Sequence, residues 1–316
     1  MPATSTSARA FPGSSAIAWF AGSLFARRLG RAPAAIGALC VLTALVLGAL
    51  LAPFIAVTNP YDLASLDLLD SHLPPAFMPG GNARFLLGTD SQGADVASLI
   101  LYGLRASLSV GVLAVSISVG LGTLAGLASG YLGGLYDGII MRIADIQFTF
   151  PAMLLALLIG GVSQSLLSNE MRSALAMPIV VLALGIAHWP HFARLVRGAV
   201  LVERQKDYVA AARLVGRGPA FIMATQLLPN VLNPIFVLAT LDIAFAIMSE
   251  ATLSFLGFGM PSTQPSLGTL IRIGYSYLFS GEWWVVIFPG MTLVALLVSI
   301  NVFGDWLRDL LDPKLN

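Results

Sequence analysis

Six stretches of this chain are long and apolar enough to cross the hydrocarbon core of a lipid bilayer. They cover residues 34–57, 106–132, 148–167, 173–189, 231–249 and 284–303. A helix needs about 20 residues to cross that core, because each residue adds about 1.5 Å of length. Only 10% of the 316 residues are charged, 57% are hydrophobic, and the mean hydropathy is +0.85. We therefore predict an all-α, polytopic membrane protein with six transmembrane helices.

The basic residues predict which side of the membrane each end of a span faces. An even number of spans places both termini on the same side, and cytoplasmic loops carry an excess of Lys and Arg. Thirteen of the 17 basic residues would then face the cytoplasm: Arg9, Arg27, Arg28, Arg31, Arg142, Arg194, Arg197, Arg204, Lys206, Arg213, Arg217, Arg308 and Lys314. The other four would face outward: Arg84, Arg105, Arg172 and Arg272. Both termini are predicted to be cytoplasmic.

The spans divide the chain into five predicted parts. These are a cytoplasmic or interfacial N-terminal segment (1–33), a first transmembrane helix (34–57), an external loop (58–105), a core of five transmembrane helices (106–304) and a cytoplasmic tail (305–316). The apolar run 14–26 is too short to span and precedes a basic cluster, so we expect an interfacial helix and not a cleaved signal peptide. The external loop is rich in Pro and Gly, and its backbone could not be satisfied inside the bilayer.

A polar insert separates the fourth and fifth spans, at residues 203–230. Its first part is rich in Ala and favours a helix, while Gly216 and Gly218 permit a turn. Pro219 suits the first turn of a second helix, where its missing N–H costs little. We predict a compact helix-turn-helix on the cytoplasmic side, where it can contact a soluble partner.

The sequence lacks the common catalytic motifs. The only two lysines are Lys206 and Lys314, so no phosphate-binding loop is present, and neither a Gly-x-Ser-x-Gly nor a His-Glu-x-x-His motif occurs. His188 and His191 are spaced so that they could share a metal, but no Cys accompanies them and we favour interfacial histidines beside an aromatic residue. We expect no enzymatic activity and no bound cofactor or metal, which leaves transport, a channel or a membrane scaffold.

Two carboxylates belong to the predicted fifth span. Asp242 lies in its middle, where an ionised carboxylate costs about 2.5–3.5 kcal/mol. Asp242 is therefore a candidate for a translocation pathway, either as a cation or proton site or as a polar patch. The alternative is a hydrogen bond across a helix interface to Ser, Thr or Asn. Glu250, at the outer end of the same helix, is a second pathway candidate, although we favour a role in organising the following loop.

Glycines and prolines predict where the spans pack closely and where they bend. Gly122, Gly126 and Gly130 recur at every fourth residue of the second span, so one bare helix face can meet a neighbouring backbone. Four prolines lie at or inside spans, where they bend or end helices: Pro53, Pro151, Pro178 and Pro289.

Several stretches, in order along the chain, resemble the permease subunits of ABC importers of the dipeptide/oligopeptide/nickel family, in particular its C-type permease. The polar insert is similar to the EAA loop of these proteins, with Ala210, Ala211 and Ala212, then Gly216, and Leu228-Pro229 at its end, although Ala210 replaces the usual Glu. Residues 87–95 and 102–108 resemble the entry to the second span, with Ala94 in place of Arg. Residues 250–259 and 265–268 resemble the external loop after the fifth span, with Leu267 in place of Trp. Residues 288–290 and 301–315 match the closing segment, and 141–151 match more weakly.

The resemblance implies a type I importer permease fold in the plasma (inner) membrane of a prokaryote. The chain would be one permease subunit of an ATP-driven, binding-protein-dependent importer of di- or oligopeptides. Its partners would be a homologous second permease, two cytoplasmic ATPase subunits that bind ATP and Mg, and an external solute-binding protein, with no nucleic acid. The alternatives are import of nickel or another small solute, and an ion-coupled secondary transporter that uses Asp242.

Two sets of site residues follow from the resemblance. The set for coupling to the ATPase is Asp207, Tyr208, Val209, Ala210, Ala211, Ala212, Arg213, Leu214, Val215, Gly216, Arg217, Leu228 and Pro229. Its docking face would be Tyr208, Val209, Ala212, Leu214, Val215 and Gly216, with Arg213 and Arg217 at the rim. The external set is Gly88, Thr89, Asp90, Gly93, Asp95, Gly257, Gly259, Pro265 and Gly268. The external residues would contact the binding protein or form a gate; alternatively, they are ordered turns that pack on each other.

Overall fold

The computed structural model describes residues 29–311 except for residues 31 and 63–65. The predicted interfacial helix 14–26 lies outside these residues. The long helices are α2 (Pro33–Ile55), α3 (Val96–Leu132), α4 (Gly134–Thr149), α5 (Ala152–Leu166), α6 (Asn169–Glu203), α9 (Leu228–Phe255) and α11 (Trp284–Leu311). The short ones are η2 (Leu68–Asp70), α7 (Asp207–Leu214), α8 (Pro219–Ile222), η3 (Met223–Leu227), α10 (Leu267–Tyr277) and η4 (Leu278–Ser280). The described residues form no β-strand, only one isolated bridge between Thr89 and Asp95.

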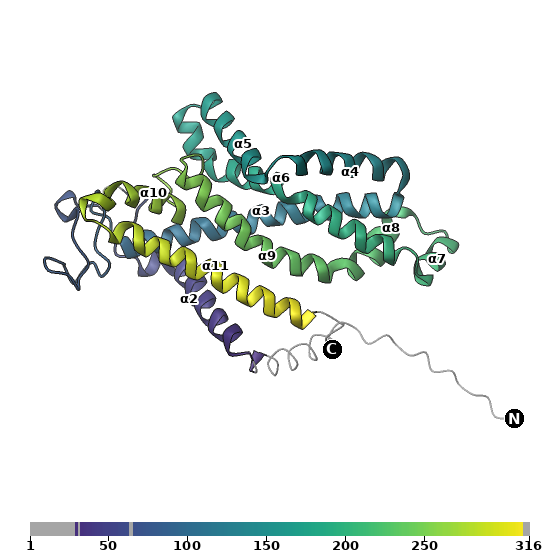
Figure 1. The fold of residues 1–316 in the computed structure, drawn as a ribbon, viewed down its shortest axis with the longest axis horizontal. Helices are drawn as coiled ribbons and strands as arrows, with labels where there is room; N and C mark the ends of the chain where they lie inside the picture. Colours follow the sequence, from purple (N-terminus) through teal and green to yellow (C-terminus); the bar gives the residue numbers. More distant parts are fainter. Residues whose placement is uncertain (1–28, 31, 63–65, 312–316) are drawn as a thin grey trace.

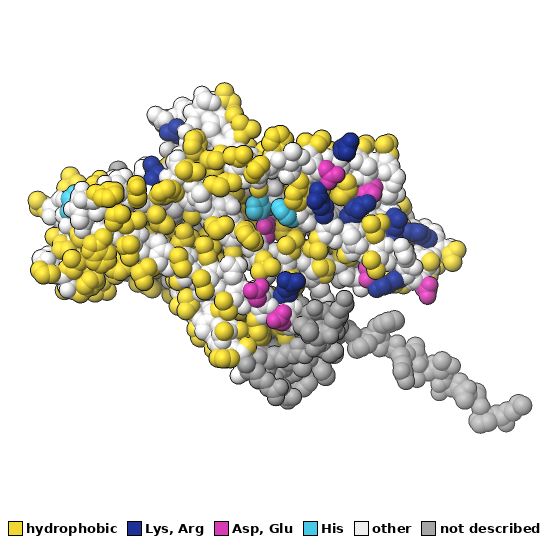
Figure 2. All heavy atoms as spheres, viewed as in Figure 1, with side chains coloured by type: hydrophobic (Ala, Val, Ile, Leu, Met, Phe, Trp, Pro, Cys, Tyr) yellow, Lys and Arg dark blue, Asp and Glu magenta, His cyan; other side chains and the backbone are white. Residues whose placement is uncertain are grey.

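The helices form an elongated bundle with two different ends (Figure 1). Five helical segments of the described chain are long and apolar enough to cross a membrane, or six when α4 and α5 count as one bent span. This result confirms the predicted all-α membrane fold. The loop before α3 and helix α10 lie at one end of the bundle, and α7 and α8 lie at the other. Lys and Arg side chains gather toward the α7 end in Figure 2, as expected for a cytoplasmic end.

Helix α3 begins at Val96, before the predicted first residue of the second span. The external loop therefore ends at Asp95, and not at residue 105 as predicted. The Asp95 carboxylate accepts a hydrogen bond from the backbone N–H of Ser98 at 2.8 Å and so caps the helix. The prediction was wrong because apolar composition locates the part of a helix inside the bilayer, whereas capping residues set where the helix starts.

The predicted third span, 148–167, is not one straight helix. It is replaced by α4 and α5, whose axes differ in direction by 83°. Phe150 has extended backbone angles (φ −95°, ψ 128°) and Pro151 follows it. A proline has no N–H to donate and disfavours helical angles at the preceding residue, so the helix breaks there. The remaining length of the span lies in α4, which packs against α6.

Helix α6 continues through Pro190 to Glu203, so the predicted end at residue 189 was wrong. Pro178 and Pro190 both lie inside the helix, and Pro190 is buried. A membrane helix tolerates proline where neighbouring helices pack around the freed backbone groups.

Helix α11 also extends beyond the predicted end of its span. It reaches Leu311, so the first half of the predicted tail, 305–316, is helical.

The most extensive helix contact in the molecule is between α3 and α6. A Cβ atom at Gly126 would lie 2.6 Å from the carbonyl oxygen of Ala193, and one at Gly130 would lie 2.8 Å from the Val200 Cβ atom. Such distances are too short for any side chain, so the glycines allow the two backbones to approach. The predicted glycine face is therefore a packing surface, and it fixes the cytoplasmic half of α6, from which the polar insert emerges.

Candidate functional site

Helix α7 is a short helix with a sharply defined end. Asp207 in its first turn and Arg213 in its last turn complement the helix dipole. Gly216 adopts a positive φ of 80°, and the backbone N–H of Arg217 donates to the Ala212 carbonyl at 3.1 Å while that of Gly216 donates to the Arg213 carbonyl at 2.9 Å. These two bonds form a Schellman motif, which glycine favours because it has no Cβ atom. The chain is thereby turned toward α8, as the sequence predicted.

One face of α7 is anchored in the body of the protein. Val209 has no exposed surface and belongs to a buried cluster with Val200 of α6, Ile222 of α8 and Val231 of α9. The same cluster includes Phe192, Val196 and Leu227, and Leu228 and Ala212 pack against it. Val209 was predicted to dock a partner, and this prediction was wrong because the side chain faces inward. Its role is to fasten α7 to the membrane-spanning helices.

Tyr208 connects both ends of the insert. Its hydroxyl donates to the Glu203 carboxylate at 2.7 Å and accepts a hydrogen bond from the Asn230 amide at 3.2 Å. Burial and the bond to Glu203 raise the pKa of Tyr208 to about 12, so the phenol stays protonated at neutral pH. Because Glu203 ends α6 and Asn230 lies in the first turn of α9, this hydroxyl holds the two long helices at the base of α7.

The opposite side of the insert presents an exposed apolar tip, formed by Leu214 and Val215. Their exposed fractions are 90% and 76%. Arg213 lies over the Tyr131 ring at 4.9 Å, and Arg217 lies over the Phe221 ring at 4.6 Å. A groove of about 320 Å³ runs beside the tip and is lined by Tyr208, Ala211, Ala212, Val215, Arg217, Phe221 and Gln226. The arrangement leaves one apolar protrusion between two arginines that are stacked on aromatic rings.

The remaining residues of the predicted coupling set have supporting positions. Asp207, Ala210 and Ala211 are exposed on α7, beside the tip. Leu228 and Pro229 start α9 directly after the π-helical segment η3, and Pro229 lies in the first turn, where it leaves no donor unsatisfied.

The first half of the predicted external set, residues 88–95, is almost entirely buried. The Thr89 hydroxyl donates to the Asp70 carbonyl at 2.6 Å, and the Thr89 carbonyl accepts a hydrogen bond from the Trp284 indole at 3.1 Å. Burial raises the pKa of Asp90, although its carboxylate accepts backbone hydrogen bonds from Gln92 and Ala94. These side chains tie the external loop to α3 and α11, so they are not available to a docking partner.

The second half of the external set, residues 257–268, also consists of packed turns. Gly257 is exposed with a φ of 87°, whereas Pro265 and Gly268 are buried. A side chain at Gly259 would meet Ser254, and one at Gly268 would meet the Ala251 backbone. Asp90 and Pro265 line one small groove, so the two halves lie against each other. The arrangement is that of ordered turns, and only Gly257 of the nine residues is exposed.

Asp242 forms a buried pair with His188. The Asp242 carboxylate lies 2.8 Å from the Nδ1 atom of His188 across the interface between α9 and α6. This geometry matches the predicted alternative of a hydrogen bond across a helix interface, and not a site on an open pathway. The partner is a histidine in place of the expected Ser, Thr or Asn. The His188 ring is buried inside the bundle, and α6 continues for fifteen residues beyond it to Glu203.

Glu250 is fully buried near the outer end of α9. Its carboxylate accepts hydrogen bonds from the Ser107 hydroxyl of α3 at 2.9 Å and from the Ser254 hydroxyl at 2.6 Å. Ser254 in turn accepts the backbone N–H of Met260 at 2.9 Å, and Ser107 accepts that of Leu267 at 3.3 Å. Glu250 therefore holds the loop between α9 and α10 on α3, as predicted. Its side chain is fully buried, whereas its position at the end of a span suggested a place near the surface.

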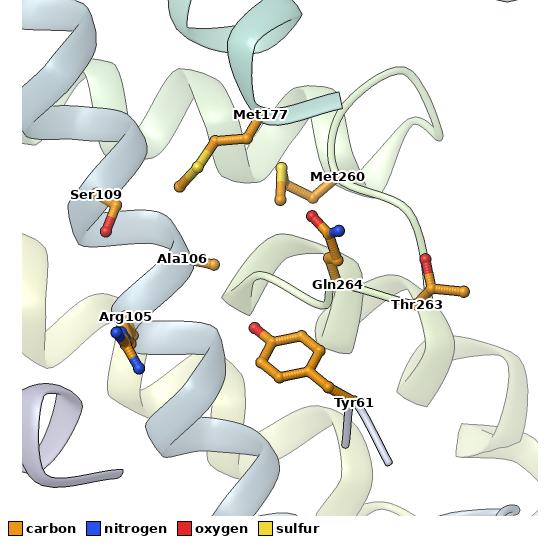
Figure 3. Close-up of a pocket in the computed structure, with 8 residues that line it drawn as sticks. All are labelled: Tyr61, Arg105, Ala106, Ser109, Met177, Met260, Thr263 and Gln264. Carbon is orange, nitrogen blue, oxygen red and sulfur yellow. The ribbon is translucent and has the colours of Figure 1, made fainter. Parts of the chain in front are cut away.

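A cavity of about 650 Å³ opens on the outer half of the bundle (Figure 3). It is lined by Tyr61, Arg105, Ala106, Ser109, Met177, Met260, Thr263 and Gln264. None of these residues was predicted as a site residue, and Arg105 was considered only for the topology. The signal that could have found it is a single cation in a long apolar helix, because such residues commonly mark a ligand or a pathway.

Comparisons with known proteins agree with this architecture. Residues 120–316 match the family described as the binding-protein-dependent transport system inner membrane component, and residues 22–75 match the N-terminal transmembrane domain of oligopeptide transport permease C. The dipeptide transport system permease protein DppC of Haemophilus influenzae is 39% identical over 266 residues, which are 84% of this chain and 85% of that protein. The protein of the same name from Escherichia coli K12 is 42% identical over 267 residues, 84% of each chain.

A solved structure shares the fold. It is an inward-facing conformation of the MetNI methionine ABC transporter, which matches 68% of this chain and 96% of the solved chain with a TM-score of 0.52. The identity is 21%, so the likeness concerns the fold alone.

Proposed function

Because this chain belongs to the family of binding-protein-dependent transport system inner membrane components, and is thus a multi-pass permease subunit of an ABC importer, we propose that its cargo is di- or oligopeptides. The relatives that carry peptide transport in their names cover most of this chain, which supports the proposal. Nickel complexes or other small solutes are the alternative cargo. Uptake of a labelled dipeptide by the reconstituted transporter, with nickel uptake measured in parallel, distinguishes the two.

We further propose the composition of the assembly. The permease pairs with a homologous second permease, two cytoplasmic ATPase subunits bind ATP and Mg, and an external solute-binding protein delivers the cargo. This chain would hold no cofactor and catalyse no hydrolysis itself, since its sequence has no phosphate-binding loop. An ion-coupled transporter that uses Asp242 is disfavoured, because that carboxylate is buried against His188 and does not line the outer cavity.

The observation that carries the coupling proposal is the exposed tip of α7. Leu214 and Val215 are apolar, exposed and held on a helix that is anchored to α6, α8 and α9 through Val209. An apolar protrusion of this kind can insert into a groove of an ATPase subunit and transmit its movement as a rigid unit. Arg213 and Arg217 would then contact the rim of that groove.

The test is a substitution at the tip. Leu214→Asp or Val215→Asp places a charge in the contact, so we expect at least a tenfold loss of ATP-driven uptake and of co-purification of the ATPase with the tagged permease. Leu214→Met keeps an apolar side chain and serves as the matched control, with uptake close to wild type. The amount of permease in the membrane is measured for each variant. Normal coupling in both Asp variants, at normal expression, would refute this role of the tip.

A further inference from the structure

We propose that the outer cavity binds the carboxylate end group of the transported solute, and that Arg105 is the residue that binds it. The inference rests on the proposed peptide cargo. Peptides of different sequence share a terminal carboxylate, so a site for that group serves the whole class. The cavity is formed by α3 on one side and by Tyr61, Thr263 and Gln264 on the other, with Met177 and Met260 between them (Figure 3).

The charge of the cavity favours an anionic group. Arg105 lies nine residues after the start of α3, about 14 Å along the helix from its outer end. It is exposed and forms no ion pair or hydrogen bond with any residue that the structure describes. Among the residues that the structure describes, no Asp or Glu lines the cavity. Its guanidinium has no carboxylate partner among the described residues and can bind one through two parallel hydrogen bonds.

Tyr61 supplies a second donor on the opposite wall. Its ring packs edge-on against Tyr102 with centroids 5.2 Å apart, which holds the phenol at the cavity. Burial raises the pKa of Tyr61, with the positive charge of Arg105 acting in the opposite direction, so the hydroxyl is protonated at neutral pH and can donate. Because Arg105 and Tyr61 both line the cavity, it offers two donors to a carboxylate.

The rest of the lining suits a cargo of variable side chains. Met177 and Met260 are flexible and polarisable, and methionines accommodate ligands of different shape. The Gln264 amide offers both a donor and an acceptor. The volume of about 650 Å³ lies within the range of small-molecule pockets, roughly 300–1,000 Å³. One fixed cation and adaptable walls match a solute with a constant end group and a changing body.

The experiment compares two probes that differ only in this end group. Dialanine and dialanine amide are titrated against the assembled transporter in nanodiscs of zwitterionic lipid, which removes competing anionic headgroups. The variants are Arg105→Gln, Arg105→Lys and, as a matched control, Arg84→Gln, which changes an outer arginine that is 61% exposed and outside the cavity. Wild type and Arg84→Gln should bind dialanine at least tenfold more tightly than its amide. Arg105→Gln should abolish this preference, and Arg105→Lys should keep part of it.

Three results would overturn the inference. The first is equal affinity of wild type for the two probes, which includes no binding of either probe. The second is a preference for dialanine that survives Arg105→Gln. The third is loss of the assembled complex in Arg105→Gln, which would make Arg105 a contact to the second permease. ATP-driven uptake of labelled dialanine is measured on the same wild-type preparation with the binding protein present. If dialanine is taken up but the binding titration shows no preference for dialanine over its amide, only the role of Arg105 is overturned. If dialanine is not taken up, the proposed cargo is overturned.

Discussion

Val209 and Val215 are identical side chains six residues apart, and their surroundings are opposite. Val209 lies inside the bundle with Ile222 and Val231, whereas Val215 is 76% exposed beyond the end of α7. The difference arises because a helix returns to the same face only after three or four residues, so two positions six residues apart point in different directions. Residue type alone therefore could not separate the anchor from the tip.

This contrast predicts different effects of the same substitution. Val209→Ala removes two buried methyl groups and leaves a cavity, so we expect a loss of about 2 kcal/mol in the free energy of unfolding. The measurement is the Tm of the purified protein. Val215→Ala, the matched control, removes only exposed groups and should leave the Tm unchanged. Equal Tm values for the two variants would show that α7 is not anchored through Val209.

At the scale of helices, a face made of glycines lets the backbone of a neighbouring helix approach closely. The face of α3 that carries Gly122, Gly126 and Gly130 meets α6 so closely that no Cβ atom fits, while Gly120 of the same helix has no neighbouring atom within 4 Å of the position of a Cβ. The repeat at every fourth residue was readable in the sequence. Which helix would fill the bare face was not, because any of the other spans could have packed there.

These glycines provide a matched pair for an experiment. Gly126→Ala places a Cβ against the backbone of Ala193 and forces α3 and α6 apart, so we expect the purified protein to lose stability by more than about 1 kcal/mol. Gly120→Ala adds the same methyl group in open space and gains helix propensity, which should leave stability equal or higher. Thermal unfolding of both variants checks the prediction, and a neutral Gly126→Ala would contradict the close contact.

The presence of a helix was easier to predict from the sequence than the position of a bend, because a proline breaks some helices and not others. Pro151 separates α4 from α5 by 83°, whereas Pro190 lies inside an unbroken α6. Asp145 and Asp137 of α4 form ion pairs with Arg194 and Arg197 of α6, both at 2.6 Å, and so hold the first half of the broken span along α6. The outcome depends on these contacts between helices, and the local sequence contains no record of them.

At the scale of the whole molecule, the predicted topology places α7 in the cytoplasm and the external loop outside. Single cysteines at Val215 and Leu69, each in a Cys40→Ser background, test this arrangement in intact cells. Both positions are exposed, with Leu69 at 89%, so access by the reagent is not limited by burial. A membrane-impermeant thiol reagent should label Leu69→Cys directly and Val215→Cys only after the membrane is opened. Direct labelling of Val215→Cys would reverse the orientation and exclude contact with a cytoplasmic ATPase.

The sequence by itself determined the membrane class, the helical insert between the fourth and fifth predicted spans and the glycine face of α3. These features follow from the length of apolar runs and from the spacing of residue types along a helix, both of which depend on residues close together in the sequence. Only the tertiary structure decided that Val209 faces inward, that Thr89 and Asp95 are parts of a buried turn, that Asp242 pairs with His188, and that Arg105 lines a cavity. Each of these depends on which segments, distant in sequence, pack together, and the packing energy that chooses them is a property of the whole fold.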